Sequence, residues 1–201
     1  DAHPRVGLVG PLLRYGDGTV QSSRRRFPSF GQALMESTIL EEWFPRNRWA
    51  REYRLEDVPI AGPLQVDWVN GSCMMVRSEA IAQVGLLDER IFMYSEELDW
   101  CRRLAAAGWA VVFLPEAEVV HYEGRSSGQV AASRQIYFDS SKVYYFGKHH
   151  GACQAEALRL FLLLGHLVHL AEEGLKFAVG HKRDLRRERV AAYWRVLRSG
   201  L

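Results

Sequence analysis

Short apolar runs and helical repeats alternate along the first part of this sequence. Residues 6–13 form a Gly-flanked apolar run that leads through YGDG into residues 19–27, a pattern typical of two strands around a turn. Apolar residues then recur at about the helical period over residues 30–44, which predicts a helix. Residues 45–63 carry prolines, arginines and acids without a steady period, and we interpret them as a long loop.

The next segment follows a strand-then-helix order twice. Residues 64–77 are apolar and β-branched, which predicts a strand, and SEAIAQVG after them has a Ser N-cap, an early Glu and a terminal Gly, as in a short helix. The stretch YSEELDWCRRLAAAG has the same layout, with Ser95 as N-cap and Gly108 as the stop. Residues 109–121 return to extended structure. Strands that alternate with helices predict a mixed α/β sheet.

From residue 130 onward the pattern is helical throughout. Residues 158–171 are strongly apolar, but the run is too short for a membrane span and is interrupted by Arg159, His166 and His169. A basic stretch follows it. Two interpretations remain open: a helix on a membrane surface, held by its apolar face and its lysines and arginines, or a hairpin packed on the domain with a solvated basic face. We divide the chain into a domain at residues 1–128 and a helical C-terminal extension at residues 129–201.

The composition is that of an ordinary globular protein. The chain has 201 residues, of which 48% are hydrophobic, and a formal net charge of +2, so it can bury a core of normal size. Its three cysteines are far apart and lack metal-ligand spacing, which favours a reducing, cytoplasmic environment. The first residues do not show the pattern of a signal peptide. Since the chain begins with Asp rather than Met, we expect it to be part of a longer protein.

The stretch YSEELDWCRR places three carboxylates, Glu96, Glu97 and Asp99, at the predicted start of a helix. Acids in a first turn stabilise a helix by roughly 0.3–1 kcal/mol each, and Asp99 is spaced for surface ion pairs with the following arginines. A carboxylate at a helix N-terminus also stays ionised at neutral pH, which suits a general base. Glu96 and Glu97 point about 100° apart, so one of them can face a cleft. The residues alone leave the structural and the catalytic role open.

Three motifs occur in order: DWVNGS at residues 67–72, EELDWCRR at residues 96–103 and VVH at residues 119–121. In this order they resemble the second half of family 2 inverting glycosyltransferases of the GT-A fold, especially bacterial rhamnosyltransferase-like members. The resemblance covers most of residues 6–128. It implies the acceptor-side part of a GT-A domain, with a Rossmann-like mixed sheet.

The resemblance implies a direct displacement with inversion, in which an acceptor hydroxyl attacks the anomeric carbon of a nucleotide sugar. Such a reaction needs a base beside the hydroxyl and positive charge beside the leaving diphosphate. The acceptor would be a saccharide or a polyprenyl-linked sugar. The nucleotide-binding half, with the family's Asp-x-Asp motif that this sequence lacks, would precede residue 1, so we expect the chain alone to be inactive.

By the family pattern, Glu97 is the predicted base and Glu96 the second candidate. His121 is the predicted ligand of a divalent cation, Mg²⁺ or Mn²⁺, ions that oxygen-rich sites suit. Some of these positions also have a structural interpretation, such as a β-bulge at the glycine and a half-buried strand position for the tryptophan. Substrate contacts are predicted at six further residues: Asp67, Trp68, Gly71, Ser72, Asp99 and Arg125.

The alternative function is a non-catalytic sugar-binding or scaffold module of the same fold, and the alternative location is peripheral, on the inner face of the cell membrane. We expect no nucleic-acid partner, because the overall charge is nearly neutral and aromatic residues do not interleave the basic run KRDLRRER. The earlier basic run, Arg24 to Arg26, could also help to hold an anionic ligand, but we interpret it as a solvated charge run.

Overall fold

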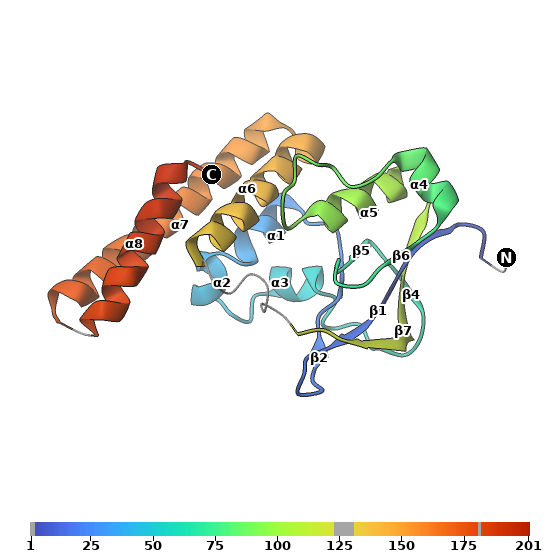
Figure 1. Ribbon diagram of the computed structural model, residues 1–201, viewed down its shortest axis with the longest axis horizontal. Coiled ribbons are helices and arrows are strands. Elements are labelled where there is room, and N and C mark those ends of the chain that lie inside the picture. The colour runs from blue at the N-terminus through green and yellow to red at the C-terminus, as the bar shows by residue number, and fades with distance from the viewer. Residues whose placement is uncertain (1–2, 123–130, 181) are drawn as a thin grey trace.

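The computed structural model of the chain describes residues 3–122, 131–180 and 182–201. A small sheet occupies one side of the molecule and three long helices occupy the other, with shorter helices between them (Figure 1). The predicted mixed α/β class is confirmed, and the arrangement fits a partial GT-A domain followed by helices.

The larger sheet is built around strand β1, Val6–Arg14. Strand β7, Ala110–Val120, runs parallel to β1, whereas β2 (Val20–Gln21) and β6 (Met75–Val76) pair with β1 in antiparallel fashion. Strand β4, Leu64–Val66, pairs antiparallel with the far side of β7. The predicted strands on either side of the first turn and before His121 are therefore confirmed.

The single strand predicted over residues 64–77 is wrong in extent. After β4 the chain leaves the larger sheet, and β5, Trp68–Val69, pairs with β3, Arg24–Arg25, in a separate two-stranded sheet. Directly after β5, the side-chain oxygen of Asn70 accepts a hydrogen bond from the backbone N–H of Ser72 at 2.9 Å, which closes a tight turn before β6.

The single helix predicted over residues 30–44 is also split. Helix α1 covers Phe30–Met35 and helix α2 covers Ile39–Trp43. Between them Ser37 has a left-handed φ of 55°, and the hydroxyl of Thr38 caps α2 by accepting a hydrogen bond from the N–H of Leu40 at 3.2 Å. Such side chains compete with helical hydrogen bonds, which explains why the apolar period did not produce one continuous helix.

The loop predicted at residues 45–63 contains an unexpected short helix, α3, Arg48–Tyr53. The side chain of Asn47 caps it by accepting a hydrogen bond from the N–H of Ala50 at 2.8 Å. Ala50 and Tyr53 are buried, so this one-turn amphipathic segment packs into the core even though its surroundings lack a steady period.

Helices α4, Ser78–Val84, and α5, Glu96–Ala106, lie where they were predicted, and Ser95 occupies the predicted N-cap position of α5, whereas the predicted N-cap of α4 is wrong. Arg77 takes the cap position of α4, and no side chain caps that helix. Ser95 precedes α5 with a left-handed φ of 64° and makes no capping hydrogen bond. Gly108 follows the end of α5 with a φ of 85°, in agreement with its predicted role as a stop.

The C-terminal part is helical as predicted, and its described residues form α6 (Ala131–His150), α7 (Ala152–Ala178) and α8 (Arg183–Ser199). Helices α7 and α8 form the packed hairpin that one of the two sequence interpretations proposed. None of the helices in the described ranges is long and apolar enough to cross a membrane. The division at residue 128 stays a prediction, because one continuous core holds side chains from both sides of it, among them Leu8, Phe113, Leu98, Tyr145, Phe146, Leu158 and Leu162.

Candidate functional site

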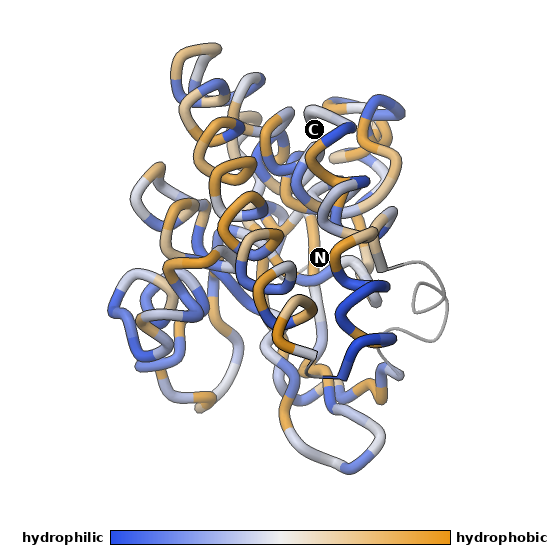
Figure 2. The backbone as a smooth tube through the Cα atoms, turned by 90° about the vertical axis from the view of Figure 1, so that its left-hand side faces the viewer, coloured by the Kyte–Doolittle hydropathy of each residue, from blue (hydrophilic) through white to orange (hydrophobic). Residues whose placement is uncertain are grey.

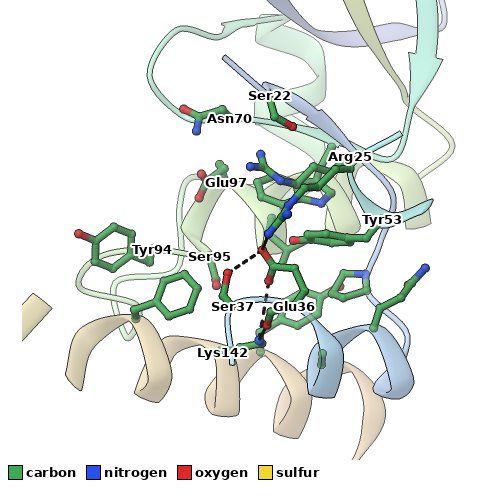
Figure 3. Close-up of a pocket in the computed structure, with 18 of the residues that line it drawn as sticks. Ser22, Arg25, Glu36, Ser37, Tyr53, Asn70, Tyr94, Ser95, Glu97 and Lys142 are labelled. Carbon is green, nitrogen blue, oxygen red and sulfur yellow. Dashed lines mark hydrogen bonds and ion pairs between the residues drawn. The ribbon is translucent and has the colours of Figure 1, made fainter. Parts of the chain in front are cut away.

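A pocket of about 910 Å³ opens between the two-stranded sheet of β3 and β5, the start of α5 and helix α6. This is a normal size for a small-molecule site. Figure 3 shows Asn70, Glu97 and Arg25 on one side of the pocket and Glu36 and Lys142 on the other. Helix α6 supplies part of the lining, so the helical part of the chain helps to build the site.

Glu97 lies in the first turn of α5 and lines this pocket. Its Oε1 accepts a hydrogen bond from the N–H of Gly71 at 3.2 Å, and its Oε2 is buried and has no hydrogen-bond partner among the described residues. Burial and the neighbouring charge of Glu96 raise the pKa of Glu97 to about 7, while the Gly71 N–H and Arg25 act in the opposite direction. A carboxyl group with a pKa near neutrality is well suited to general acid–base chemistry.

With a pKa of about 7, Glu97 is only partly ionised at neutral pH, whereas the sequence predicted a fully ionised carboxylate at a helix N-terminus. Its carboxyl group sits against packed side chains, and the cost of burying its charge outweighs the favourable helix dipole. Glu96, the second candidate base, does not line the pocket, although its Oε2 is buried without a partner among the described residues. Of the two predicted bases, only Glu97 faces the pocket.

The segment Asn70–Ser72 connects Glu97 with His121. Gly71 contacts the glutamate closely, since a Cβ at this position would lie 3.4 Å from Cβ and Cδ of Glu97. The hydroxyl of Ser72 lies 3.3 Å from Nδ1 of His121, which is also 3.0 Å from Oε1 of Gln21. An alanine at position 71 would touch Glu97 at about the normal contact distance, whereas a larger side chain would meet its carboxyl group. His121 is not among the residues that line the pocket.

The described residues do not by themselves form a metal centre. None of them gather into a group of three or more His, Cys, Asp or Glu side chains able to hold an ion. Among the described residues, the Nδ1 of His121 lies within hydrogen-bond distance of the neutral side chains of Ser72 and Gln21, whereas Mg²⁺ and Mn²⁺ prefer carboxylate oxygens. A role for His121 as a metal ligand stays a prediction.

Arg25 also lines the pocket, and its positive charge lowers the pKa of the predicted base, Glu97. Its guanidinium lies over two aromatic rings, 5.0 Å from the centroid of Trp68 and 5.9 Å from that of Tyr53. Its Nη1 is buried and has no hydrogen-bond partner among the described residues. The interpretation of residues 24–26 as a solvated charge run is wrong for Arg24, which is buried and donates hydrogen bonds to backbone carbonyls, among them that of Pro59 at 3.3 Å. Arg25 is partly buried, and Arg26 is exposed as that interpretation expects.

The opposite wall holds a buried ion-pair cluster. Nζ of Lys142, on α6, donates a hydrogen bond to the carbonyl of Glu36 at 2.8 Å, and the Glu36 carboxylate lies 3.2 Å from Arg54. Burial lowers the pKa of Lys142. Burial alone would raise the pKa of Glu36, but Lys142 and Arg54 lower it, so this carboxylate stays ionised. The cluster gives the pocket a polar wall joined to α6.

The remaining predicted contacts divide into pocket and structural residues. Trp68 lines the pocket and donates its indole N–H to the carbonyl of Arg26 at 2.8 Å. Asp67 is outside the lining and accepts a hydrogen bond from the N–H of Phe27 at 2.7 Å, which fixes the start of the turn into α1. Arg125 lies outside the described residues.

Asp99 is wholly buried, and the prediction that it pairs at the surface is wrong. It lies 2.8 Å from Nε of Arg103, 2.7 Å from Nζ of Lys148 and 2.7 Å from Nε2 of His149. Burial would raise its pKa, but these three partners lower it. Because Lys148 and His149 belong to α6, Asp99 holds the helix that carries Glu97 against α6 rather than contacting the pocket.

Three lining residues, Glu36, Tyr53 and Lys142, were not indicated by the sequence. They come from three distant segments, and no local motif connects them. Arg25 belongs to the basic run at residues 24–26, which the sequence offered as a possible contact for an anionic ligand.

Comparison with known proteins supports the resemblance noted in the sequence. Residues 46–135 match the model of a family described as glycosyltransferase like family 2. The chain is 41% identical over 150 residues to the N-acetylglucosaminyl-diphospho-decaprenol L-rhamnosyltransferase of Mycobacterium tuberculosis. The aligned region covers 74% of this chain and 48% of that protein. It is 40% identical over 57 residues to Rhamnosyltransferase WbbL of Escherichia coli, covering 28% of this chain and 22% of the relative. The chain thus spans about half the length of the mycobacterial relative.

Proposed function

We propose that this chain, which is similar in sequence to rhamnosyltransferases and matches glycosyltransferase like family 2, takes part in the transfer of a sugar from a nucleotide-sugar donor. The sugar is rhamnose, the acceptor is a saccharide or a polyprenyl-linked sugar, and the anomeric configuration is inverted. The mycobacterial relative, named for an N-acetylglucosaminyl-diphospho-decaprenol acceptor, motivates this choice of acceptor class. The proposed location is cytoplasmic, peripheral on the inner face of the cell membrane.

The observation that carries the proposal is the placement of Glu97. Its carboxyl group faces a pocket of sugar size, has one buried oxygen without a partner among the described residues, and has a pKa raised to about 7. In the proposed reaction Glu97 takes the proton from an acceptor hydroxyl as that oxygen bonds to the anomeric carbon. The bond from that carbon to the diphosphate breaks, and the nucleoside diphosphate leaves with the electron pair.

Arg25 supports the same reaction from the neighbouring wall. Its unpaired Nη1 and its aromatic neighbours provide a fixed cation next to Glu97, which favours the ionised form of the base and can attract an anionic substrate group. We include Mg²⁺ or Mn²⁺ as the cofactor that the family resemblance implies, with His121 as the predicted ligand. Since the described residues do not complete a metal centre, no step is assigned to the ion.

The test is a transfer assay on the complete gene product, with nucleotide-activated L-rhamnose and a short-chain N-acetylglucosaminyl-diphospho-prenol. Product is measured by mass spectrometry and its anomeric configuration by NMR. We expect Glu97→Gln to lower kcat by about 10²-fold or more, as for the loss of a general base. The exposed Glu118, which is not among the residues that line the pocket, provides the control: Glu118→Gln should retain full activity.

Two results would contradict the proposal in different ways. Full transfer by both Glu97→Gln and Glu96→Gln would remove the assignment of the base. Binding of the acceptor by the wild-type protein with no transfer under any condition would favour the alternative, a non-catalytic sugar-binding or scaffold module.

A further inference from the structure

Helix α7 has an apolar outer face that nothing in the described structure covers. Its inner face packs against α6 and α8 through residues such as Leu158, Leu162 and His166. On the opposite side Leu160, Leu164 and Leu167 are 55%, 58% and 51% exposed. A helix that is apolar on all sides is normally buried on all sides, so this face is unusual for a water-facing surface.

The exposed leucines form one continuous stripe. Leu160, Leu164, Leu167, Ala171 and Leu175 follow the spacing of one helical face and span about 22 Å along the axis. Leu175 is 68% exposed, and Val179, just after the helix, is 73% exposed. No charged residue lies within this stripe, which makes it a long apolar surface rather than a scatter of single residues.

The end of the stripe is strongly basic. Residues 176–198 contain eight Lys or Arg residues and two Asp or Glu residues. Glu173 pairs with Arg186 at 2.7 Å and lies 3.4 Å from Arg189, whereas Lys182, Arg183 and Arg187 are exposed at and just after the turn between the helices. Figure 2 looks onto this side of the molecule and shows the largely apolar tube of α7 beside the hydrophilic start of α8.

From this juxtaposition we propose that the outer face of α7 lies in the interface of an anionic lipid bilayer, with Leu160, Leu164 and Leu167 among the acyl chains. The basic residues around Lys182 and Arg183 contact the lipid phosphates. An apolar helix face that ends in a cluster of cations matches the two layers of such a surface, the acyl boundary and the anionic headgroups.

Charge as well as apolarity favours a lipid bilayer over a second copy of this chain as the partner of the exposed α7 face. A second copy of this chain would bring the same basic cluster with it, and the like charges near the end of the stripe would repel each other unless the copies were offset. An anionic bilayer offers the complementary charge along its whole surface. The inference rests on the proposed peripheral location and deepens it by naming the residues that contact the bilayer. It does not depend on the proposed sugar transfer, because lipid binding is measured without any sugar substrate.

The experiment is flotation of the protein with phosphatidylcholine vesicles, with and without phosphatidylglycerol. We expect binding to the anionic vesicles that weakens as salt is added. The double variant Leu164→Glu, Leu167→Glu should bind about a hundredfold more weakly, since each leucine contributes roughly a factor of ten or more on burial. The variant Lys182→Glu, Arg183→Glu should bind anionic vesicles at least about tenfold more weakly.

The control is Leu86→Glu, a residue that is 71% exposed and lies outside the helical hairpin. It should bind like the wild type, and thermal unfolding shows whether each variant is folded. Wild-type protein that does not float with anionic vesicles would overturn the proposal, as would unchanged flotation of the folded Leu164→Glu, Leu167→Glu variant. A dimer in analytical ultracentrifugation that this variant dissolves, without any vesicle binding, would instead assign the face to a second copy.

Discussion

Replacing the predicted base by its neutral isostere should stabilise the protein while it removes activity. In the folded protein the pKa of Glu97 is about 7, compared with an ordinary value of 4.5. Folding thus favours the protonated form of this carboxyl group. The resulting contribution to the unfolding free energy is fully present below about pH 4.5 and is lost as the pH rises through 7. The Glu97→Gln variant does not lose this unfolding free energy as the pH rises, because glutamine does not ionise.

A shift of this size corresponds to about 3 kcal/mol of unfolding free energy, and since the side chain partly faces the open pocket we expect between about 1 and 3 kcal/mol. The glutamine oxygen can still accept the hydrogen bond from Gly71. Urea unfolding followed by circular dichroism at several pH values measures the effect. The variant and the wild type should be equally stable near pH 4.5, and the variant should be more stable at pH 8.5.

The reasoning fails if the two proteins have the same unfolding free energy at pH 8.5, because the carboxyl group would then have an ordinary pKa. Glu118→Gln is the control for the loss of an exposed ion pair, with Arg14, and should change stability by no more than about 1 kcal/mol at any pH.

Three further predictions concern the neighbours of Glu97. Arg25→Gln should shift the rising limb of the pH–rate profile to higher pH, and Glu96→Gln should shift it to lower pH, because the arginine lowers and the glutamate raises the pKa of Glu97; shifts in the same direction would contradict this electrostatic scheme. Gly71→Val should lower kcat more than about tenfold, since the branched side chain would occupy the space of the Glu97 carboxyl group. Gly71→Ala should have a smaller effect, because its Cβ would lie 3.4 Å from Glu97. Equal kcat values for both variants would argue against this contact. Asp99→Asn should lower the unfolding free energy by about 3 kcal/mol, because it leaves the cations of α5 and α6 without their buried partner, and urea unfolding at pH 7 would show no change if the pair were dispensable.

The sequence predicted the features of this fold that are determined by residues close together in the sequence. The order of strands and helices, the stop at Gly108 and the location of the acids followed from local patterns and motifs. The break at Ser37 and Thr38 was hidden, because the apolar positions on either side keep the helical period while the hydroxyl hydrogen bonds interrupt it.

The electrostatics of the site could not be predicted in the same way. The raised pKa of Glu97 depends on burial by segments that are distant in the sequence, and the position of Arg25 depends on the pairing of β3 with β5. A motif search finds the acids, but it contains no information on which of two adjacent glutamates is enclosed. Only the packed structure distinguishes Glu97, which lines the pocket, from Glu96, which does not.

The core that continues from the sheet into α6 and α7 limits how such a protein can diversify. Tyr145 and Phe146 are fully buried, and Lys142 of the same helix reaches the pocket wall. Exchange of the C-terminal helices for those of another protein would therefore alter the substrate cavity at the same time. The proposed lipid-binding face and part of the pocket wall belong to the same packed group of C-terminal helices. Evolutionary replacement of the lipid-binding helices would therefore also change the shape of the pocket.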